Sequence, residues 1–126
     1  MWLVGPLALA LGGCGGPRME DVRLISGTAR RDGHLYAVTA VIENGSRERL
    51  VLDDVSIEVA AFGASGRPVG DPKPFGFGGI VEPGHTSRLP LYRPDQRSEI
   101  RSSRLVLKDA NGRTISTIDV EPLPAP

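Results

Sequence analysis

Apolar side chains alternate with less apolar ones along several short runs, and this pattern restricts the fold more than any other feature of the sequence. In residues 55–62 every second position is apolar, beginning with Val55, whereas Ser56 and Glu58 fall on the opposite face. A period of two places neighbouring side chains on opposite sides of an extended chain, so the run predicts a half-buried β-strand. From Glu20 onward no segment sustains the period of a helix, so we expect an all-β domain.

Turn-forming residues separate about seven to nine such runs at intervals of roughly 8–12 residues. Residues 34–43 are apolar on both faces and predict a central strand, whereas the pair Asn111-Gly112 predicts a hairpin and the proline- and glycine-rich residues 71–79 predict a loop. This spacing is typical of an immunoglobulin-like antiparallel β-sandwich, with a closed barrel as the alternative. The expected strands cover residues 22–29, 34–43, 50–52, 55–62, 68–69, 80–82, 86–92, 104–108 and 113–120.

The first sixteen residues contain no charged side chain. Their apolar run, residues 2–11, is about ten residues long, which is too short to cross a bilayer as a helix and matches the apolar region of a signal peptide. Residues 11–14, Leu-Gly-Gly-Cys, resemble the lipobox of bacterial lipoproteins. The resemblance implies that Cys14 is acylated and becomes the first residue of the mature chain. Two alternatives remain: ordinary cleavage after residues 8–10, or Cys14 as a buried thiol of a cytoplasmic protein.

These boundaries divide the chain into four parts: a signal peptide (residues 1–13), a short lipidated linker (14–19), one β-sandwich (20–120) and a proline-rich tail (121–126). All fifteen basic and fifteen acidic residues follow Pro17, so the mature chain is densely charged but neutral overall. Nothing in this balance favours binding to nucleic acid. Because Cys14 is the only cysteine, the sandwich is expected to fold without an internal disulfide.

A second resemblance covers residues 36–92. Residues 41–46 (VIENGS), the alternating run within 52–62, Gly66 and residues 82–84 (EPG) resemble the FxLYD-type and related immunoglobulin-like modules of bacterial envelope proteins. The Leu-Tyr-Asp core of that motif is replaced here by residues 59–62 (VAAF). The resemblance supports the predicted sandwich and implies little about function, because a fold by itself does not fix an activity.

Candidate catalytic and metal-binding residues are few. His34 and His85 each stand alone next to a turn, and the neighbouring Asp53 and Asp54, even together with Asp32, lack the spaced series of a calcium loop. We therefore expect no metal, no cofactor and no enzymatic activity. The alternative is a hydrolase whose loop-borne site is built near Asp53, Asp54 and His85, which requires these groups to converge in a cleft.

The most distinctive stretch of the expected domain is a loop in which Phe75 and Phe77 stand among glycines. Exposed, the two rings are a possible interaction site for a protein partner or for lipid; folded back, they plug one end of the sandwich. A further possibility is pairing of an exposed strand edge, near Pro68 or Leu50, with a partner sheet. The sequence thus predicts a lipid-anchored, non-catalytic binding or scaffolding protein of the cell envelope. If the cell has two membranes, the resemblance to lipoproteins implies the outer one, facing the periplasm, because Gly15 rather than Asp follows the cysteine.

Overall fold

A computed structural model describes residues 17–124 of the chain. The predicted signal peptide, the lipobox and Cys14 lie outside the described residues, as do residues 125–126. No helix within residues 17–124 is both long and apolar enough to cross a membrane. The described part contains the 3-10 turns η1 (Met19–Asp21), η2 (Leu52–Asp54) and η3 (Ala64–Gly66), and the strands β1 (Val22–Asp32), β2 (Leu35–Asn44), β3 (Leu50–Val51), β4 (Val55–Phe62), β5 (Lys73–Gly76), β6 (Ile80–Val81), β7 (Thr86–Pro94), β8 (Ser102–Asp109) and β9 (Thr114–Val120).

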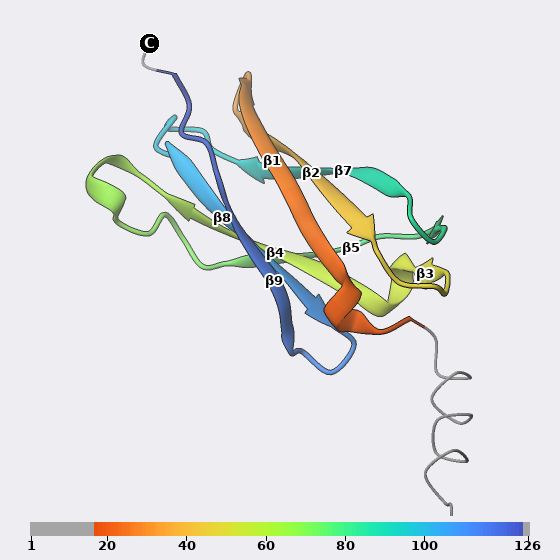
Figure 1. Cartoon of the computed structure of the whole chain (residues 1–126). Helices are drawn as coiled ribbons and strands as arrows, with labels where there is room; N and C mark the ends of the chain where they lie inside the picture. Colours follow the sequence, from red (N-terminus) through yellow and green to blue (C-terminus); the bar gives the residue numbers. More distant parts are fainter. Residues whose placement is uncertain (1–16, 125–126) are drawn as a thin grey trace, which may run out of the picture.

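The strands form an antiparallel β-sandwich, which confirms the predicted fold class (Figure 1). One sheet has the strand order β1-β2-β7, the other has the order β5-β4-β8-β9, and β3 pairs with β6 in a short separate ribbon. The chain changes sheet three times, between β2 and β4, between β5 and β7, and between β7 and β8, which is the arrangement of immunoglobulin-like domains. The nine strands fall within the predicted number.

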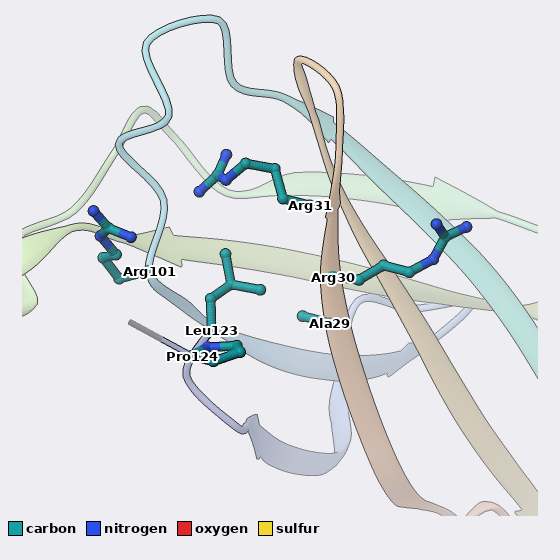
Figure 2. Close-up of a pocket in the computed structure, with 6 residues that line it drawn as sticks. All are labelled: Ala29, Arg30, Arg31, Arg101, Leu123 and Pro124. Carbon is teal, nitrogen blue, oxygen red and sulfur yellow. The ribbon is translucent and has the colours of Figure 1, made fainter. Parts of the chain in front are cut away.

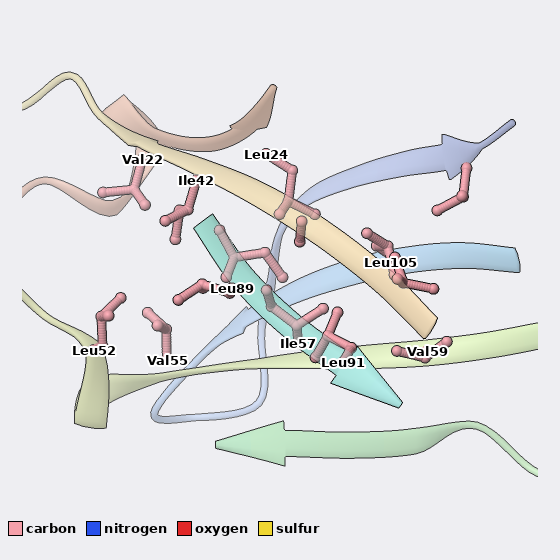
Figure 3. Packing of buried hydrophobic residues seen from close by; sticks show 14 of the residues in the cluster. Val22, Leu24, Ile42, Leu52, Val55, Ile57, Val59, Leu89, Leu91 and Leu105 are labelled. Atoms are coloured by element: carbon pink, nitrogen blue, oxygen red, sulfur yellow. The ribbon is translucent and has the colours of Figure 1, made fainter. Parts of the chain in front are cut away.

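The core lies between the inner faces of the two sheets (Figure 3). Ile57 and Leu105 from the four-stranded sheet and Ile42 from β2 are fully buried. Tyr36 on β2 crosses the core, and its hydroxyl lies 2.8 Å from Oγ of Ser103 on β8. Burial raises the pKa of Tyr36, so the hydroxyl stays neutral. This hydrogen bond joins the two sheets at a point where both side chains are out of reach of water.

The first and last strands close one side of the sandwich. The edges of β1 and β9 lie against each other without a backbone ladder, and the amide of Leu24 donates to Oγ of Ser116 at 3.1 Å. Gly27 of β1 packs so tightly that a Cβ would stand 3.0 Å from the side chains of Leu105 and Val120. The absence of a side chain here lets β1 approach the opposite sheet.

Most strand predictions are confirmed, but the expected strand at residues 68–69 is only an isolated bridge between Pro68 and Phe62, and one loop prediction is wrong. The strand at residues 55–62 is present with alternating burial, and residues 35–44 form the central strand of the three-stranded sheet. The predicted loop at residues 71–79 instead contains β5, which pairs with β4. The prediction was wrong because it rested on Pro74 as the sign of a loop. β5 is an edge strand, and an edge strand tolerates a residue without an N–H group.

The predicted hairpin across Asn111-Gly112 is also present, joining β8 to β9. Only Gly112 takes a positive φ, of 82°, and its amide donates to the carbonyl of Asp109 at 3.0 Å. The turn is therefore longer than a two-residue connection, and the ladder shifts register after Leu107.

Candidate functional site

Within residues 17–124, no hydrogen bond or ion pair joins the side chains of the hydrolase alternative to one another. Asp53 and Asp54 lie on η2, His85 follows the turn after β6, and no hydrogen bond joins the imidazole to either carboxylate. Asp32 ends β1 at the opposite end of the sandwich. The described residues contain no group of three or more His, Cys, Asp or Glu side chains placed to hold a metal ion. His85 has a structural role through its backbone, because its carbonyl accepts a hydrogen bond from the amide of Asn44 at 3.0 Å.

Phe75 and Phe77 are both half-buried and pack against the core. Phe75 lies on β5 directly opposite Ile57 of β4. This packing matches the alternative in which the two rings fold back onto the sandwich, where they complete a core that has few aromatic residues. An interaction role for the two rings stays a prediction.

The open strand edges are poorly suited to pairing with a partner sheet. β7 is an edge strand that carries Pro90 and Pro94, and β5 is an edge strand that carries Pro74. The ladder between β2 and β7 runs unbroken past Pro90 and ends at Pro94, so we infer that the nitrogen of Pro90 faces the open edge. Prolines remove donors from an edge and so oppose the addition of a strand. Of the two predicted stretches, Leu50 is already paired with Val81, and Pro68 makes a single bridge to β4.

A buried ionic site fixes the loop between β7 and β8. The Asp95 carboxylate accepts hydrogen bonds from Nη1 of Arg31 at 2.6 Å and from the amides of Glu99 and Ile100 at 2.8 and 3.0 Å. Burial alone would raise the pKa of Asp95, but these hydrogen bonds outweigh burial and lower it. The same Arg31 donates from Nη2 to the carbonyl of Ile100 at 2.8 Å. No sequence pattern indicated this site, because a charged residue in a loop is ordinarily solvated.

Arg93 is a second buried charge that the sequence did not reveal. It projects inward from β7 and donates from Nη1 to the carbonyl of Val59 at 2.8 Å and from Nη2 to that of Val69 at 3.2 Å. Burial lowers its pKa, while Asp71 and Asp95 oppose that shift. Arg93 thus ties the three-stranded sheet to β4, and its donors are used by the fold.

Asn44 organises the turn after β2. Its Nδ2 donates to the carbonyls of Glu48 and Val81, each at 2.8 Å, and its Oδ1 accepts from the amide and the hydroxyl of Ser46. The side chain is fully buried. The turn predicted from residues 44–46 is therefore closed by side-chain hydrogen bonds, with none of these residues at positive φ. No buried side-chain nitrogen or oxygen within residues 17–124 lacks a partner, so these polar groups serve the fold.

A shallow pocket of about 350 Å³ lies at the end of the sandwich near the C-terminal tail (Figure 2). Arg31, Arg101 and Leu123 lie on one side of β1, whereas the Arg30 guanidinium points to the other side. Arg31 is already held by Asp95, and the remaining lining is largely apolar. The pocket therefore offers one exposed guanidinium, from Arg101, beside a small apolar surface.

The outer face of the three-stranded sheet presents the most distinctive exposed surface. Tyr92 on β7 pairs with Ala37 on β2, which pairs on its other side with Arg30 of β1, while Leu35 pairs with Pro94. We name these five residues the Tyr92 face. Tyr92 and Leu35 are 45% and 37% exposed, yet Ala37 is buried although it lies outside the core cluster. Its neighbours on the sheet surface cover it, so the face is an apolar area beside the Arg30 guanidinium, which lies 3.8 Å from the Asp32 carboxylate.

The described domain belongs to the class of immunoglobulin-like β-sandwiches. No family model matches the chain, and no curated protein sequence matches it. Among solved structures, the chain is similar to the alkylpurine DNA glycosylase AlkC of Pseudomonas fluorescens bound to DNA containing an abasic site analogue, with a TM-score of 0.53 and 16% identity over 94% of this chain and 34% of that chain. A penta-heme cytochrome c552 from Thermochromatium tepidum gives a TM-score of 0.45 and 15% identity over 80% and 40% of the two chains.

The chain thus spans about a third of the glycosylase and less than half of the cytochrome. At these identities, the likeness to the glycosylase supports the sandwich fold alone, because unrelated functions share such folds.

Proposed function

We propose that the protein is a lipid-anchored, non-catalytic binding module of the cell envelope, held through acylated Cys14 and presenting the Tyr92 face to another envelope protein. The anchor half of the proposal rests on the lipobox-like residues 11–14 and on the start of the fold at Met19, only a few residues later. Two or more acyl chains hold a protein durably at a membrane, whereas a single chain holds it marginally.

The observation that carries the binding half is the composition and exposure of the Tyr92 face. Tyrosine and arginine are enriched among the residues that dominate protein–protein binding energies, and such residues cluster with apolar neighbours that exclude water. Tyr92, Leu35 and Arg30 meet this description on one side of a rigid sheet. The buried arginines and aspartate, by contrast, are engaged within the fold.

The direction of β1 and β2 is compatible with a lipid anchor at one end of the domain and a binding face at the other. β1 starts at Val22, which pairs with Asn44, and ends at Asp32, which pairs with Leu35. At about 3.3 Å per residue, the strand separates the start of the fold from Leu35 by roughly 30 Å. An anchor at the amino-terminal end therefore leaves the Tyr92 face well away from the lipid and open to a partner.

The anchor is tested by growing cells that express the full chain with labelled fatty acid. We expect label on the wild-type protein and none on Cys14→Ala, with Asp119→Asn as an unaffected control because that side chain is exposed on β9. Label retained by Cys14→Ala would contradict acylation at this residue. Absence of label from the wild-type protein would refute the proposed lipid anchor altogether.

The binding face is tested by cross-linking and capture from membranes. Tyr92→Ser combined with Leu35→Ser is expected to lose the partners that the wild-type protein retains, with only a small loss of stability, because both side chains are partly exposed and lie outside the core. Ile25→Ser is the matched control, since Ile25 is 40% exposed but lies in the bulge near the other end of β1. Equal capture by all three proteins would show that the Tyr92 face does not bind.

A further inference from the structure

Two apolar side chains stand exposed together on the short β3–β6 ribbon. Val51 and Ile80 pair directly across the ribbon and are 40% and 53% exposed, whereas their neighbours Leu50 and Val81 are buried. Partners in an antiparallel pair project from the same face, so Val51 and Ile80 form one outward apolar pair. Ile80 is the most exposed of the large apolar side chains in the described part of the chain.

A chain of hydrogen bonds holds this ribbon to the start of the fold. The amide of Gly45 donates to the carbonyl of Asp21 at 2.9 Å, which fastens η1 to the turn after β2. In the same turn, Nδ2 of Asn44 donates to the carbonyl of Val81, the neighbour of Ile80. The approach at Gly45 is so close that a Cβ there would stand 2.9 Å from the Asp21 carbonyl oxygen. The first described turn and the apolar pair therefore occupy one end of the sandwich (Figure 1).

The length of chain between Cys14 and Met19 limits how far this end can lie from an anchoring membrane. Residues 14 to 19 are joined by five Cα-to-Cα steps, and an extended chain spans at most about 3.6 Å per residue, so the linker reaches roughly 18 Å. A domain held so close has a high effective concentration at the lipid surface, so even a weak contact is populated.

We propose that the Val51–Ile80 pair rests against the phospholipid surface to which Cys14 is anchored, so that the domain stands on the membrane with the Tyr92 face directed away from it. The inference rests on the proposed acylation of Cys14 and adds an orientation to it. Side chains with apolar bodies at a membrane surface gain from contact with the boundary between headgroups and acyl chains.

Charge around the pair defines the kind of lipid surface that it fits. Four carboxylates near the ribbon outnumber two guanidiniums; these residues are Glu48, Asp53, Asp54, Glu82, Arg47 and Arg49. One of the guanidiniums, on Arg49, is already paired with Glu82 at 3.0 Å. This rim is repelled by anionic headgroups, and repulsion between exposed charges is screened by salt. The contact is therefore apolar and favours zwitterionic phospholipid.

The test places a fluorescent label at three positions of the acylated full chain in phosphatidylcholine vesicles that contain a nitroxide-labelled quenching lipid. Val51→Cys and Ile80→Cys report on the apolar pair, and Leu35→Cys is the matched control because Leu35 is 37% exposed at the far end of β2. We expect the quenching lipid to reduce emission at positions 51 and 80 and to leave emission at position 35 unchanged. Adding phosphatidylglycerol should weaken the quenching, and high salt should restore it.

Equal quenching at all three positions, or none at positions 51 and 80 in protein that carries labelled fatty acid, would overturn the orientation while leaving the anchor intact. Stronger quenching with phosphatidylglycerol would also overturn it, because an apolar contact with an acidic rim predicts the reverse. Absence of fatty acid from the wild-type chain is the separate outcome that removes the proposed anchor and this inference with it.

Discussion

Replacing Asp95 by asparagine removes one charge from the most tightly connected loop of the domain and keeps nearly the same shape. The carboxylate joins Arg31 of β1 to the amides of Glu99 and Ile100, and the Asp95 side chain is only 3% exposed. An asparagine amide can accept from some of these donors with its oxygen, but its NH₂ group then faces donors. The substitution therefore breaks the ion pair and leaves donors poorly satisfied in a buried place.

Breaking a buried ion pair by changing one partner costs about 3–5 kcal/mol of the free energy of unfolding. We expect a loss of about 3 kcal/mol, the lower end of that range, because Arg31 keeps a quarter of its side chain exposed and its bond to the Ile100 carbonyl. For a domain of about 100 residues this corresponds to a decrease in Tm of roughly 10–20 °C.

The unfolding free energy that Asp95→Asn loses should also depend on pH. The pKa of Asp95 is lowered in the folded protein, so the ionised carboxylate stabilises the fold at pH values above the ordinary aspartate pKa of about 3.9. That contribution is lost as the pH falls below 3.9 and through the lower pKa of the folded state. The difference in unfolding free energy between wild type and Asp95→Asn should therefore be constant near neutral pH and shrink under acid conditions.

Urea unfolding at several pH values, followed by circular dichroism, measures both effects. Asp119→Asn is the control, because Asp119 pairs with Arg104 at 2.8 Å but both side chains are exposed, so little change is expected. The reasoning is refuted if Asp95→Asn is no more destabilising than Asp119→Asn, or if its effect stays the same from neutral to acid pH.

Three other substitutions test the packing around the first and central strands. Asn44→Asp should lose about 3 kcal/mol of unfolding free energy, because a carboxylate oxygen then faces the two carbonyls that the amide now donates to; near-native stability in thermal unfolding would contradict this. Gly45→Ala should lose about 1–3 kcal/mol and speed amide exchange in η1, since its Cβ collides with the Asp21 carbonyl; unchanged exchange would show that the collision is relieved elsewhere. Tyr36→Phe should lose about 1–2 kcal/mol in urea unfolding by leaving the Ser103 hydroxyl without this partner, and a neutral result would count against the inter-sheet hydrogen bond.

Local patterns were sufficient to predict most of the strands. The alternation in residues 55–62 matches the burial of β4 residue by residue, because a period of two is fixed by the geometry of a single strand. Residues 73–76 were missed because Pro74, Gly76 and the prolines and glycines around them in residues 71–79 are the usual signs of a loop. β5 exists through its pairing with β4, a contact with another part of the chain that local composition does not encode.

The buried polar sites could not be predicted for the same reason. Asp95 and Arg31 are 64 residues apart in the sequence, and each taken alone resembles a solvated surface charge. Asn44 was predicted to begin a turn and is the last residue of β2, directly before that turn, but its bond to the Val81 carbonyl spans 37 residues. Such groups acquire their partners only when the two sheets and the connecting loops are in place.

By itself the sequence determined where most of the strands lie, where the chain turns between them, and that β2 is central, because these depend on the alternation and on the conformational preferences of a few neighbouring residues. Only the tertiary structure decided which apolar surface is core and which is exposed. Both faces of β2 are apolar, yet Tyr36 points into the sandwich whereas Leu35 lies on an outer face that no other element of residues 17–124 covers. The hydrophobicity of a side chain shows that its burial is favourable. The packing of the sheets determines whether that side chain is buried within the domain or stays exposed for contact with a partner.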